Sequence, residues 1–200
     1  AWWQKDSKLS APLNSNLKTV MDFSFFDNIN TAKNEQTETW FKGLDRVYNN
    51  FVYDFLYPDP TSVLAFIENH DTDRFLGEGD NLPMLKQAST LLLTTRRIPQ
   101  LYYGTEIMMN GVKSKSDGYV RKDFPGGWSD DKANALTAAG RTKLQNECYN
   151  FYKTLLNWRK GNEVIAKGNM TQFMVQHGVY AYARQYNGKT VFVMLNGTDE

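Results

Sequence analysis

The stretch that decides the fold is Val63-Leu64-Ala65-Phe66-Ile67-Glu68-Asn69-His70-Asp71-Thr72-Asp73-Arg74-Phe75. Its apolar first part predicts a short strand that is buried on both faces, as in a parallel sheet. The charged part then lies at the carboxyl end of that strand, where α/β barrels carry their catalytic groups. Taken alone, the same residues also fit a loop in which aspartates cap turns and pair with Arg74.

Two further apolar runs predict neighbouring strands, one over Leu17 to Phe26 and one over Ile98 to Tyr103. Helical periodicity follows each predicted strand, over residues 40–57, 82–95 and 144–160. A strand–helix order that occurs three times predicts right-handed crossovers and a parallel sheet. We therefore expect about three βα units of an α/β fold.

The pattern changes after Gly161. Thr171 to Gln176, Val179 to Tyr186 and Thr190 to Asn196 alternate polar with apolar residues, and Asn187-Gly188 is a two-residue hairpin signal. We expect an α/β portion over residues 1–161 and the start of a small antiparallel β domain over 162–200.

Composition narrows the classes of function. Acidic and basic residues nearly cancel, with a formal net charge of +1, so we expect neither a nucleic acid nor a membrane as partner. Aromatic residues make up 14% of the chain, which suits both core packing and stacking on sugar rings. Cys148 is the single cysteine, which excludes an internal disulfide and predicts a buried structural thiol within a helix.

Several motifs together resemble the α-amylase family of glycoside hydrolases, family 13. The stretch from Phe66 to Phe75 is similar to the family's motif after the seventh barrel strand. Gln100 to Glu106 are similar to the family's eighth-strand motif, and Val20 to Phe23 are similar to its sixth strand. Asp117 to Trp128 resemble a loop of the neopullulanase and cyclomaltodextrinase subgroup. These motifs stand in the family's order and cover almost the whole chain. The resemblance therefore implies strands 6–8 of a (β/α)8 TIM barrel, followed by part of a C-terminal β domain.

The resemblance also implies roles for individual residues. Asp71 matches the carboxylate that stabilises the transition state, and His70 matches the imidazole that donates to hydroxyls of the same sugar. Asp117 and Arg121 match a pair that binds the next sugar; an exposed ion pair four residues apart is their alternative role. Arg74 and Glu106 match residues that support the site. Trp2, Trp3 and Trp128 are candidates for either sugar stacking or core packing.

Retaining glycosidases need a nucleophile and an acid/base carboxylate about 5 Å apart. In the family these groups follow strands four and five, and both strands precede the segment that resembles strand six. No aspartate or glutamate of this chain can be assigned to either role. We therefore expect a fragment of an α-glucan hydrolase that is inactive as an isolated chain and self-associates.

Other functions remain open. A glucanosyltransferase of the same family shares the residues after strand seven, and a non-catalytic amylase-like protein keeps the barrel without its carboxylates. The implied partner is an α-glucan or a maltooligosaccharide. No cofactor is required; many family members bind calcium, mostly through an N-terminal domain, and no spacing in this chain demands a metal. We expect a periplasmic or secreted protein rather than a cytoplasmic one.

Overall fold

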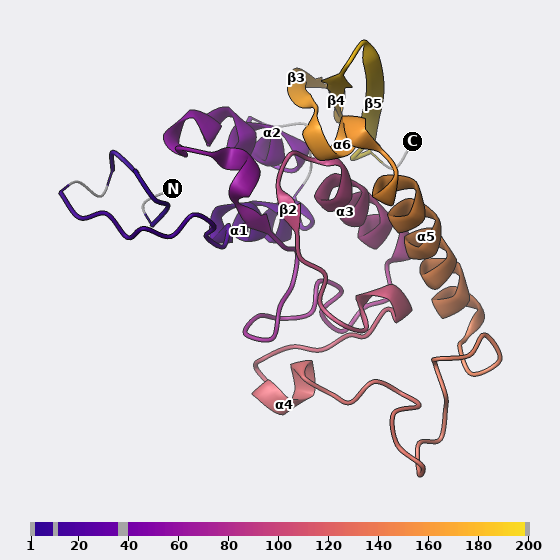
Figure 1. The fold of residues 1–200 in the computed structure, drawn as a ribbon. Helices are drawn as coiled ribbons and strands as arrows, with labels where there is room; N and C mark the ends of the chain where they lie inside the picture. The colour runs from indigo at the N-terminus through magenta and orange to yellow at the C-terminus, as the bar shows by residue number, and fades with distance from the viewer. Residues whose placement is uncertain (1–2, 10–11, 36–39, 199–200) are drawn as a thin grey trace. The chain divides into compact units, whose positions relative to one another are not determined.

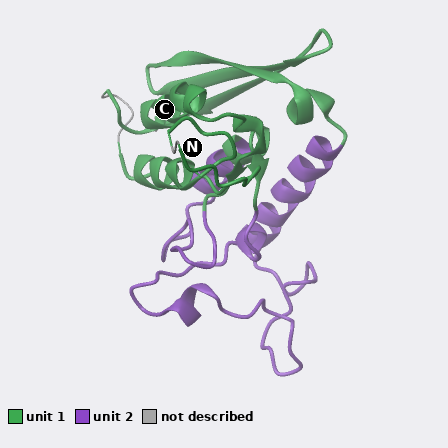
Figure 2. Cartoon of the chain, turned by 60° about the vertical axis from the view of Figure 1, so that its left-hand side comes forward, with its two compact units in different colours: residues 1–67, 91–100, 161–200 green, residues 68–90, 101–160 purple. Residues whose placement is uncertain are grey.

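The computed structural model describes residues 3–9, 12–35 and 40–198. The chain forms two compact units (Figure 2). Unit 1 comprises residues 1–67, 91–100 and 161–200, and unit 2 comprises residues 68–90 and 101–160. The boundary expected at residue 161 between an α/β portion and a β domain stays a prediction.

Figure 1 shows the helices and strands along the chain. The α-helices are α1 (Phe23–Ala32), α2 (Leu44–Val52), α3 (Leu82–Thr94), α4 (Asp117–Val120), α5 (Lys143–Lys160) and α6 (Glu163–Lys167). Short 3-10 turns cover Tyr53–Leu56, Pro60–Ser62 and Thr105–Ile107. The strands are β1 (Leu64–Ala65), β2 (Ile98–Pro99), β3 (Asn169–Gln176), β4 (Val179–Tyr186) and β5 (Lys189–Asn196). Among the helices of the described ranges, none combines the length and apolar character that a membrane crossing requires.

Short strands of unit 1 pair in parallel. β1 pairs in parallel with β2, with Leu64 opposite Ile98, and Met21 forms a parallel bridge to Leu64 on the other side. Three passes of the chain thus run in one direction, as the repeated strand–helix order predicts. The runs that pair are shorter than the expected strands.

The strand expected over Leu17 to Phe26 is wrong, because this run pairs only through an isolated bridge at Met21 and becomes helical from Phe23. Helix α1 begins at Phe23, because the Asp22 carboxylate accepts a hydrogen bond of 3.0 Å from the Phe25 amide and caps the first turn. Phe25 is buried, and Phe26 stacks on Phe66 with ring centroids 5.3 Å apart. A run of phenylalanines that suits a buried strand therefore packs equally well from one face of a helix.

The helix expected over residues 40–57 is shorter than its pattern. Helix α2 covers Leu44–Val52, and the chain continues as the 3-10 turn Tyr53–Leu56 before Pro58. At its start, Gly43 has a φ of 54°, in the left-handed region that favours glycine. The outer positions Trp40 and Phe55 are exposed, whereas Val47 and Phe51 are buried.

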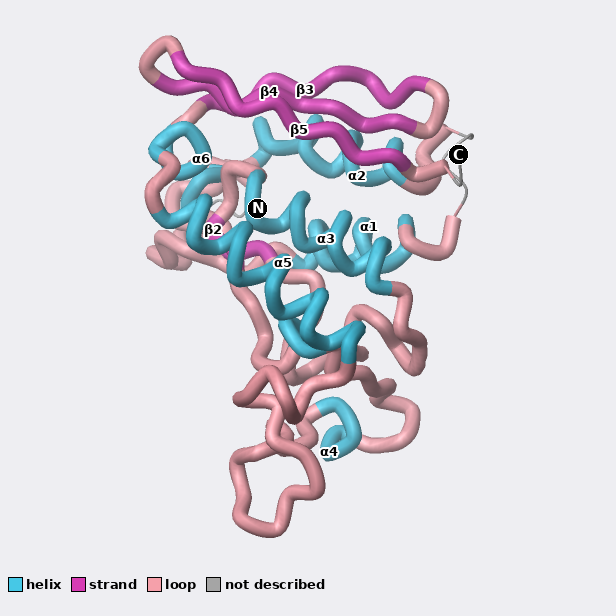
Figure 3. The backbone as a smooth tube through the Cα atoms, turned by 90° about the vertical axis from the view of Figure 1, so that its right-hand side faces the viewer, coloured by secondary structure: helices cyan, strands magenta, loops and turns pink. Residues whose placement is uncertain are grey.

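The antiparallel sheet β3-β4-β5 confirms the expected alternation, with boundaries within two residues of the prediction. Asn187 and Gly188 have φ values of 48° and 72°, as a tight hairpin turn requires. The inner face buries Tyr180, Tyr182, Val193 and Leu195. Helix α2 lies along this face (Figure 3), and the rings of Tyr48 and Tyr180 meet edge to face at 6.2 Å.

Candidate functional site

The candidate site belongs to unit 2 and begins at Glu68, just beyond the buried end of β1. Burial alternates along the loop: Glu68, Asn69 and Arg74 are buried, whereas His70 and Asp71 are exposed. The Asn69 side chain accepts a hydrogen bond of 2.8 Å from the Asp71 amide. The Thr72 hydroxyl accepts one of 2.9 Å from the Asn69 amide. These local bonds fix a tight turn that presents His70 and Asp71 outward.

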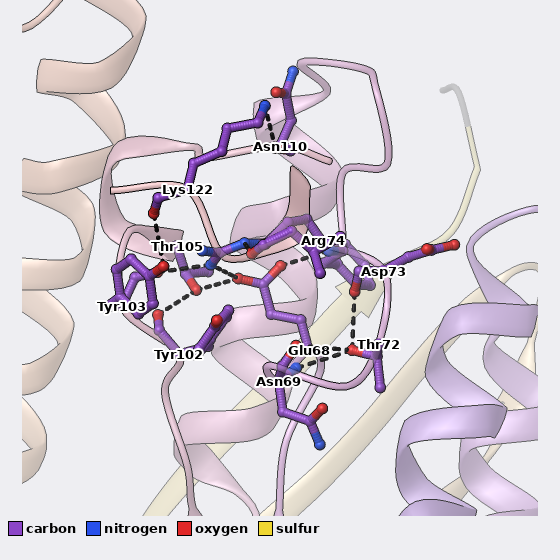
Figure 4. A network of polar contacts seen from close by, with 12 residues as sticks. Glu68, Asn69, Thr72, Asp73, Arg74, Tyr102, Tyr103, Thr105, Asn110 and Lys122 are labelled. Carbon is purple, nitrogen blue, oxygen red and sulfur yellow. Dashed lines mark hydrogen bonds and ion pairs between the residues drawn. The ribbon is translucent and has the colours of Figure 1, made fainter. Parts of the chain in front are cut away.

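Arg74 is the buried anchor of this loop (Figure 4). Its Nη1 lies 3.2 Å from Glu68 Oε1 and donates a 2.7 Å hydrogen bond to the carbonyl oxygen of Tyr103. Its Nε donates to the carbonyl oxygen of Val120 at 3.0 Å. The guanidinium also lies over the Tyr102 ring, 4.0 Å from its centroid. Arg74 thus joins the loop after β1 to two later segments of unit 2.

Glu68 meets donors on both carboxylate oxygens. Besides Arg74, the Phe75 amide donates to Oε2 at 2.5 Å, and the Thr105 hydroxyl donates to Oε1. Burial raises the pKa of the Glu68 carboxyl, whereas the donors from Thr105, Phe75 and Arg74 oppose that rise. A buried carboxylate with this many donors serves to hold the loop in place.

Asp71 and His70 meet at the exposed tip of the loop. The Nε2 atom of His70 lies 3.1 Å from Asp71 Oδ2, and Arg121 Nη2 donates to Asp71 Oδ1 at 2.9 Å. Arg121 Nε also donates to the carbonyl oxygen of His70 at 2.8 Å. More than half of the Asp71 side chain, 58%, is exposed, so this carboxylate is held in position and still open to a ligand.

Helix α4 brings the second predicted pair to the same place. Arg121 Nη2 lies 3.2 Å from Asp117 Oδ2, one turn away. The Ser116 hydroxyl caps α4 by accepting from the Tyr119 amide at 3.1 Å. The structure thus places His70, Asp71, Asp117 and Arg121 in one hydrogen-bonded group, although up to 51 positions separate the bonded residues.

Sequence reasoning missed Lys113. Its Nζ donates to the carbonyl oxygen of Asp71 at 2.9 Å and lies 3.4 Å from Asp117 Oδ1. Its main-chain amide donates to Asp73 Oδ1 at 2.6 Å. The one signal that could have found it is its position four residues before Asp117, a spacing at which opposite charges often pair. No comparable spacing in the sequence indicates that Tyr102 and Tyr103 lie against Arg74.

Glu106, expected as a support, lies in the 3-10 turn Thr105–Ile107 and is half-buried. The turn follows Gly104, whose φ of 82° and close approach to Met109 exclude a larger residue. It contacts α5, where the Cys148 thiol donates to the carbonyl oxygen of Thr105 at 3.7 Å. Burial, and next the charge of Glu106, raise the pKa of Cys148 to about 12. Complete burial confirms Cys148 as a structural thiol.

The long loop after β2 carries an exposed tryptophan. The Asp131 carboxylate accepts hydrogen bonds from the amides of Trp128, at 3.0 Å, and Gly126, at 2.6 Å. These amides hold the pKa of Asp131 below its usual range. The side chains of Trp128 and Trp3 are both 64% exposed, so neither packs in a core, and Trp2 lies outside the described residues.

The described side chains give no evidence for a metal centre. In the part of the chain that the structure describes, His, Cys, Asp and Glu form no group of three or more that could hold a metal ion. The side chains that meet at the candidate site are a carboxylate, an imidazole and cationic groups, from Asp71, His70, Arg121 and Lys113.

Comparison with known proteins identifies similar chains. Residues 170–200 match the family described as the cyclo-malto-dextrinase C-terminal domain. A cyclomaltodextrin glucanotransferase of Thermoanaerobacterium thermosulfurigenes is 30% identical over 178 residues, which cover 89% of this chain and 22% of that protein. An α-amylase of Niallia circulans is 29% identical over 178 residues, covering 89% of this chain and 30% of that protein.

A solved structure is similar in fold. The α-amylase of Geobacillus thermoleovorans, in complex with acarbose, superposes with a TM-score of 0.72 at 23% identity, covering 93% of this chain and 38% of that one. The chain spans less than a third of the length of the two curated relatives.

Proposed function

The chain belongs to the α-amylase family of glycoside hydrolases, family 13, and from that premise we propose that it is part of a retaining α-glucan hydrolase. The proposed enzyme cleaves α-1,4-glucosidic bonds in starch-derived oligosaccharides, in the manner of an α-amylase, neopullulanase or cyclomaltodextrinase. The observation that carries this proposal is the exposed Asp71 carboxylate, held by His70 on one oxygen and by Arg121 on the other.

Asp71 acts in this proposal on the sugar whose glycosidic bond breaks. As the bond breaks, the ring becomes oxocarbenium-like, and its hydroxyl groups become stronger hydrogen-bond donors. A carboxylate that accepts from them binds the transition state more tightly than the substrate, which lowers the barrier. His70 donates to hydroxyls of the same ring. Because Arg121 and His70 already hold the Asp71 carboxylate, little of its freedom remains to be lost at the moment of reaction.

Asp117 and Arg121 bind the next sugar in this proposal. Both side chains are about half exposed, Asp117 at 55% and Arg121 at 40%. A neutral, hydroxyl-rich ligand suits them, because a carboxylate accepts and a guanidinium donates, so each can bond to a different hydroxyl of one ring. The acarbose complex of the structurally similar α-amylase supports an oligosaccharide as the ligand class.

The nucleophile and the general acid lie, in our proposal, in the part of the protein that precedes this chain. The isolated 200-residue chain is then inactive, because a residue that only stabilises the transition state cannot attack the anomeric carbon or protonate the leaving oxygen. Sequencing upstream of Ala1 in the reading frame should identify an aspartate and a glutamate after two earlier strands.

The test compares the full-length protein with Asp71→Asn on maltotriose and pullulan, with sugars separated by chromatography. We expect Asp71→Asn to lower kcat by roughly 10²- to 10³-fold, the loss seen when one group that stabilises transition-state charge is removed. Asp73 is the matched control: it is an exposed aspartate two residues away that bonds to the Lys113 amide. Asp73→Asn should stay within about threefold of wild type. Equal losses in the two variants, or hydrolysis by the isolated chain, would contradict the proposal.

A glucanosyltransferase is the second candidate, because a cyclomaltodextrin glucanotransferase is among the similar proteins. Hydrolysis and transfer use the same stabilising carboxylate and differ in whether water or a sugar hydroxyl accepts the glycosyl group. Product analysis in maltotriose separates them: a hydrolase yields glucose and maltose only, whereas a transferase also yields products longer than the substrate.

A further inference from the structure

Asp117 bridges two cations that come from either side of it in the sequence. Its Oδ1 lies 3.4 Å from Lys113 Nζ, and its Oδ2 lies 3.2 Å from Arg121 Nη2. Both cations are four residues from Asp117, one before it and one after it. The three side chains form one charged cluster, which we call the Lys113–Asp117–Arg121 bridge.

Each cation of the bridge also donates a hydrogen bond to a backbone carbonyl of the loop that carries Asp71. Arg121 Nε donates to the carbonyl oxygen of His70 at 2.8 Å. Lys113 Nζ donates to the carbonyl oxygen of Asp71 at 2.9 Å. Two successive peptide groups, on either side of the Asp71 Cα atom, are therefore fixed by neighbouring charges, and this sets the direction in which the Asp71 side chain leaves the backbone.

Lys113 also bonds to the loop through its backbone. Its main-chain amide donates to Asp73 Oδ1 at 2.6 Å, so its backbone and its side chain both bind the segment from Asp71 to Asp73. Arg121, by contrast, bonds to the Asp71 carboxylate itself. Removal of Arg121 would alter the charge beside the reacting sugar. Removal of the Lys113 ammonium would alter where the carboxylate stands, because it bonds to the backbone of Asp71.

We propose that Lys113 is a positioning residue for Asp71, which acts by orienting the backbone that carries the carboxylate. The inference rests on the proposed function, since it assumes that Asp71 stabilises the transition state. If the Asp71 carboxylate were displaced, substrate could still bind through Asp117 and Arg121. The carboxylate would, however, accept weaker hydrogen bonds from the hydroxyl groups of the distorted ring. The loss therefore falls on kcat more than on KM.

The chain offers a matched control in Lys115. This lysine lies two residues further along the same loop and also pairs with an acidic residue, Glu78. Its ammonium lies 3.5 Å from the Tyr119 hydroxyl and 4.6 Å from the centre of the Tyr119 ring. Both lysines are thus partly exposed and ion-paired, but of the two only Lys113 is seen to bond to Asp71.

The experiment measures kcat, KM and Tm for Lys113→Met and Lys115→Met in the full-length protein on a maltooligosaccharide. We expect Lys113→Met to lower kcat by roughly tenfold, since small misplacements of catalytic groups carry losses of that order or larger. KM and Tm should stay close to wild type, and Lys113→Arg should recover part of kcat because it keeps the charge. Lys115→Met should leave all three values unchanged.

Equal kcat values for the two methionine variants would overturn the inference, as would a loss for Lys113→Met confined to KM or matched by a fall in Tm. Should Lys113→Met fail to fold, Lys113→Gln keeps a polar group at the same place and is judged by the same criteria. A wild-type protein without activity on α-glucans would refute the proposed function instead. Activity that depends on Asp71 but not on Lys113 would refute the inference alone.

Discussion

Substitution of Arg74 by methionine is the sharpest test of how the loop is held. Methionine keeps an unbranched side chain of similar length but removes the guanidinium, and with it the bonds to Glu68, Tyr103 and Val120. Glu68, which is 2% exposed, then loses its cationic partner. Breaking a buried ion pair by removing one partner costs about 3–5 kcal/mol of unfolding free energy.

Arg121→Met is the matched control for this change. Arg121 makes a similar number of bonds, to two carboxylates and one backbone carbonyl, but 40% of its side chain is exposed. Pairs of this kind contribute about 0–1 kcal/mol, because water screens them and replaces their bonds. The same chemical change should therefore have several times the effect at position 74.

The assay is thermal unfolding of the 200-residue chain, supported by amide hydrogen exchange in α5, which belongs to the same compact unit. A change of 1 kcal/mol shifts Tm by about 2–4 °C in a chain of this size, so Arg74→Met should lower Tm by roughly 6–20 °C. Arg121→Met should lower it by no more than about 4 °C. The double variant Glu68→Gln/Arg74→Met should be more stable than Arg74→Met, because it removes the unpaired charge. Equal shifts for the two arginines, or no gain in the double variant, would refute the reasoning.

Three further predictions concern the thiol and the surface. At pH 8, iodoacetamide should label Cys148 in the folded chain at least roughly a thousandfold more slowly than in urea, because burial raises its pKa to about 12 against an unfolded value of about 8.5; mass spectrometry follows the label, and equal rates would contradict burial. Because the pKa of Cys148 is higher in the folded chain, its contribution to the free energy of unfolding is fully present below about pH 8.5 and is lost as pH rises towards 12. Cys148→Ala should remove this pH dependence. The isolated chain should self-associate through apolar side chains such as Met194 and Phe192, which are 64% and 55% exposed; a single monomer boundary in sedimentation velocity at high concentration would argue against this.

The elements that could be predicted from sequence are those with long, regular periodicity. Helices α3 and α5 begin and end within about two residues of their patterns. The three strands of the antiparallel sheet follow alternation and the Asn187-Gly188 turn. Helix α1 was missed because its phenylalanines form a near-continuous apolar run, in which the Asp22 cap is the one local sign that a helix begins. Helix α6 has only five residues, too few to show a period.

The candidate site divides in a similar way. A local motif was enough to single out His70 and Asp71, and a second motif pointed to Asp117 and Arg121. No local pattern indicates that Arg74 reaches the carbonyl oxygen of Tyr103 or lies on the Tyr102 ring, because those contacts depend on how distant segments fold together. Lys113 was missed for the same reason, since its partner on the loop lies 42 positions away.

The contacts give the charged stretch after β1 a physical explanation that residue types alone do not. Its buried members, Glu68, Asn69 and Arg74, each bond to backbone or side chains around the loop, whereas His70 and Asp71 point outward. A site that must hold a carboxylate within a fraction of an ångström needs such a supporting layer as much as it needs the carboxylate. It follows that Arg74→Met should lower kcat in the full-length enzyme although Arg74 never touches the substrate. At a temperature where the variant remains folded, that loss should resemble the loss in Lys113→Met, because both side chains act through the backbone that carries Asp71.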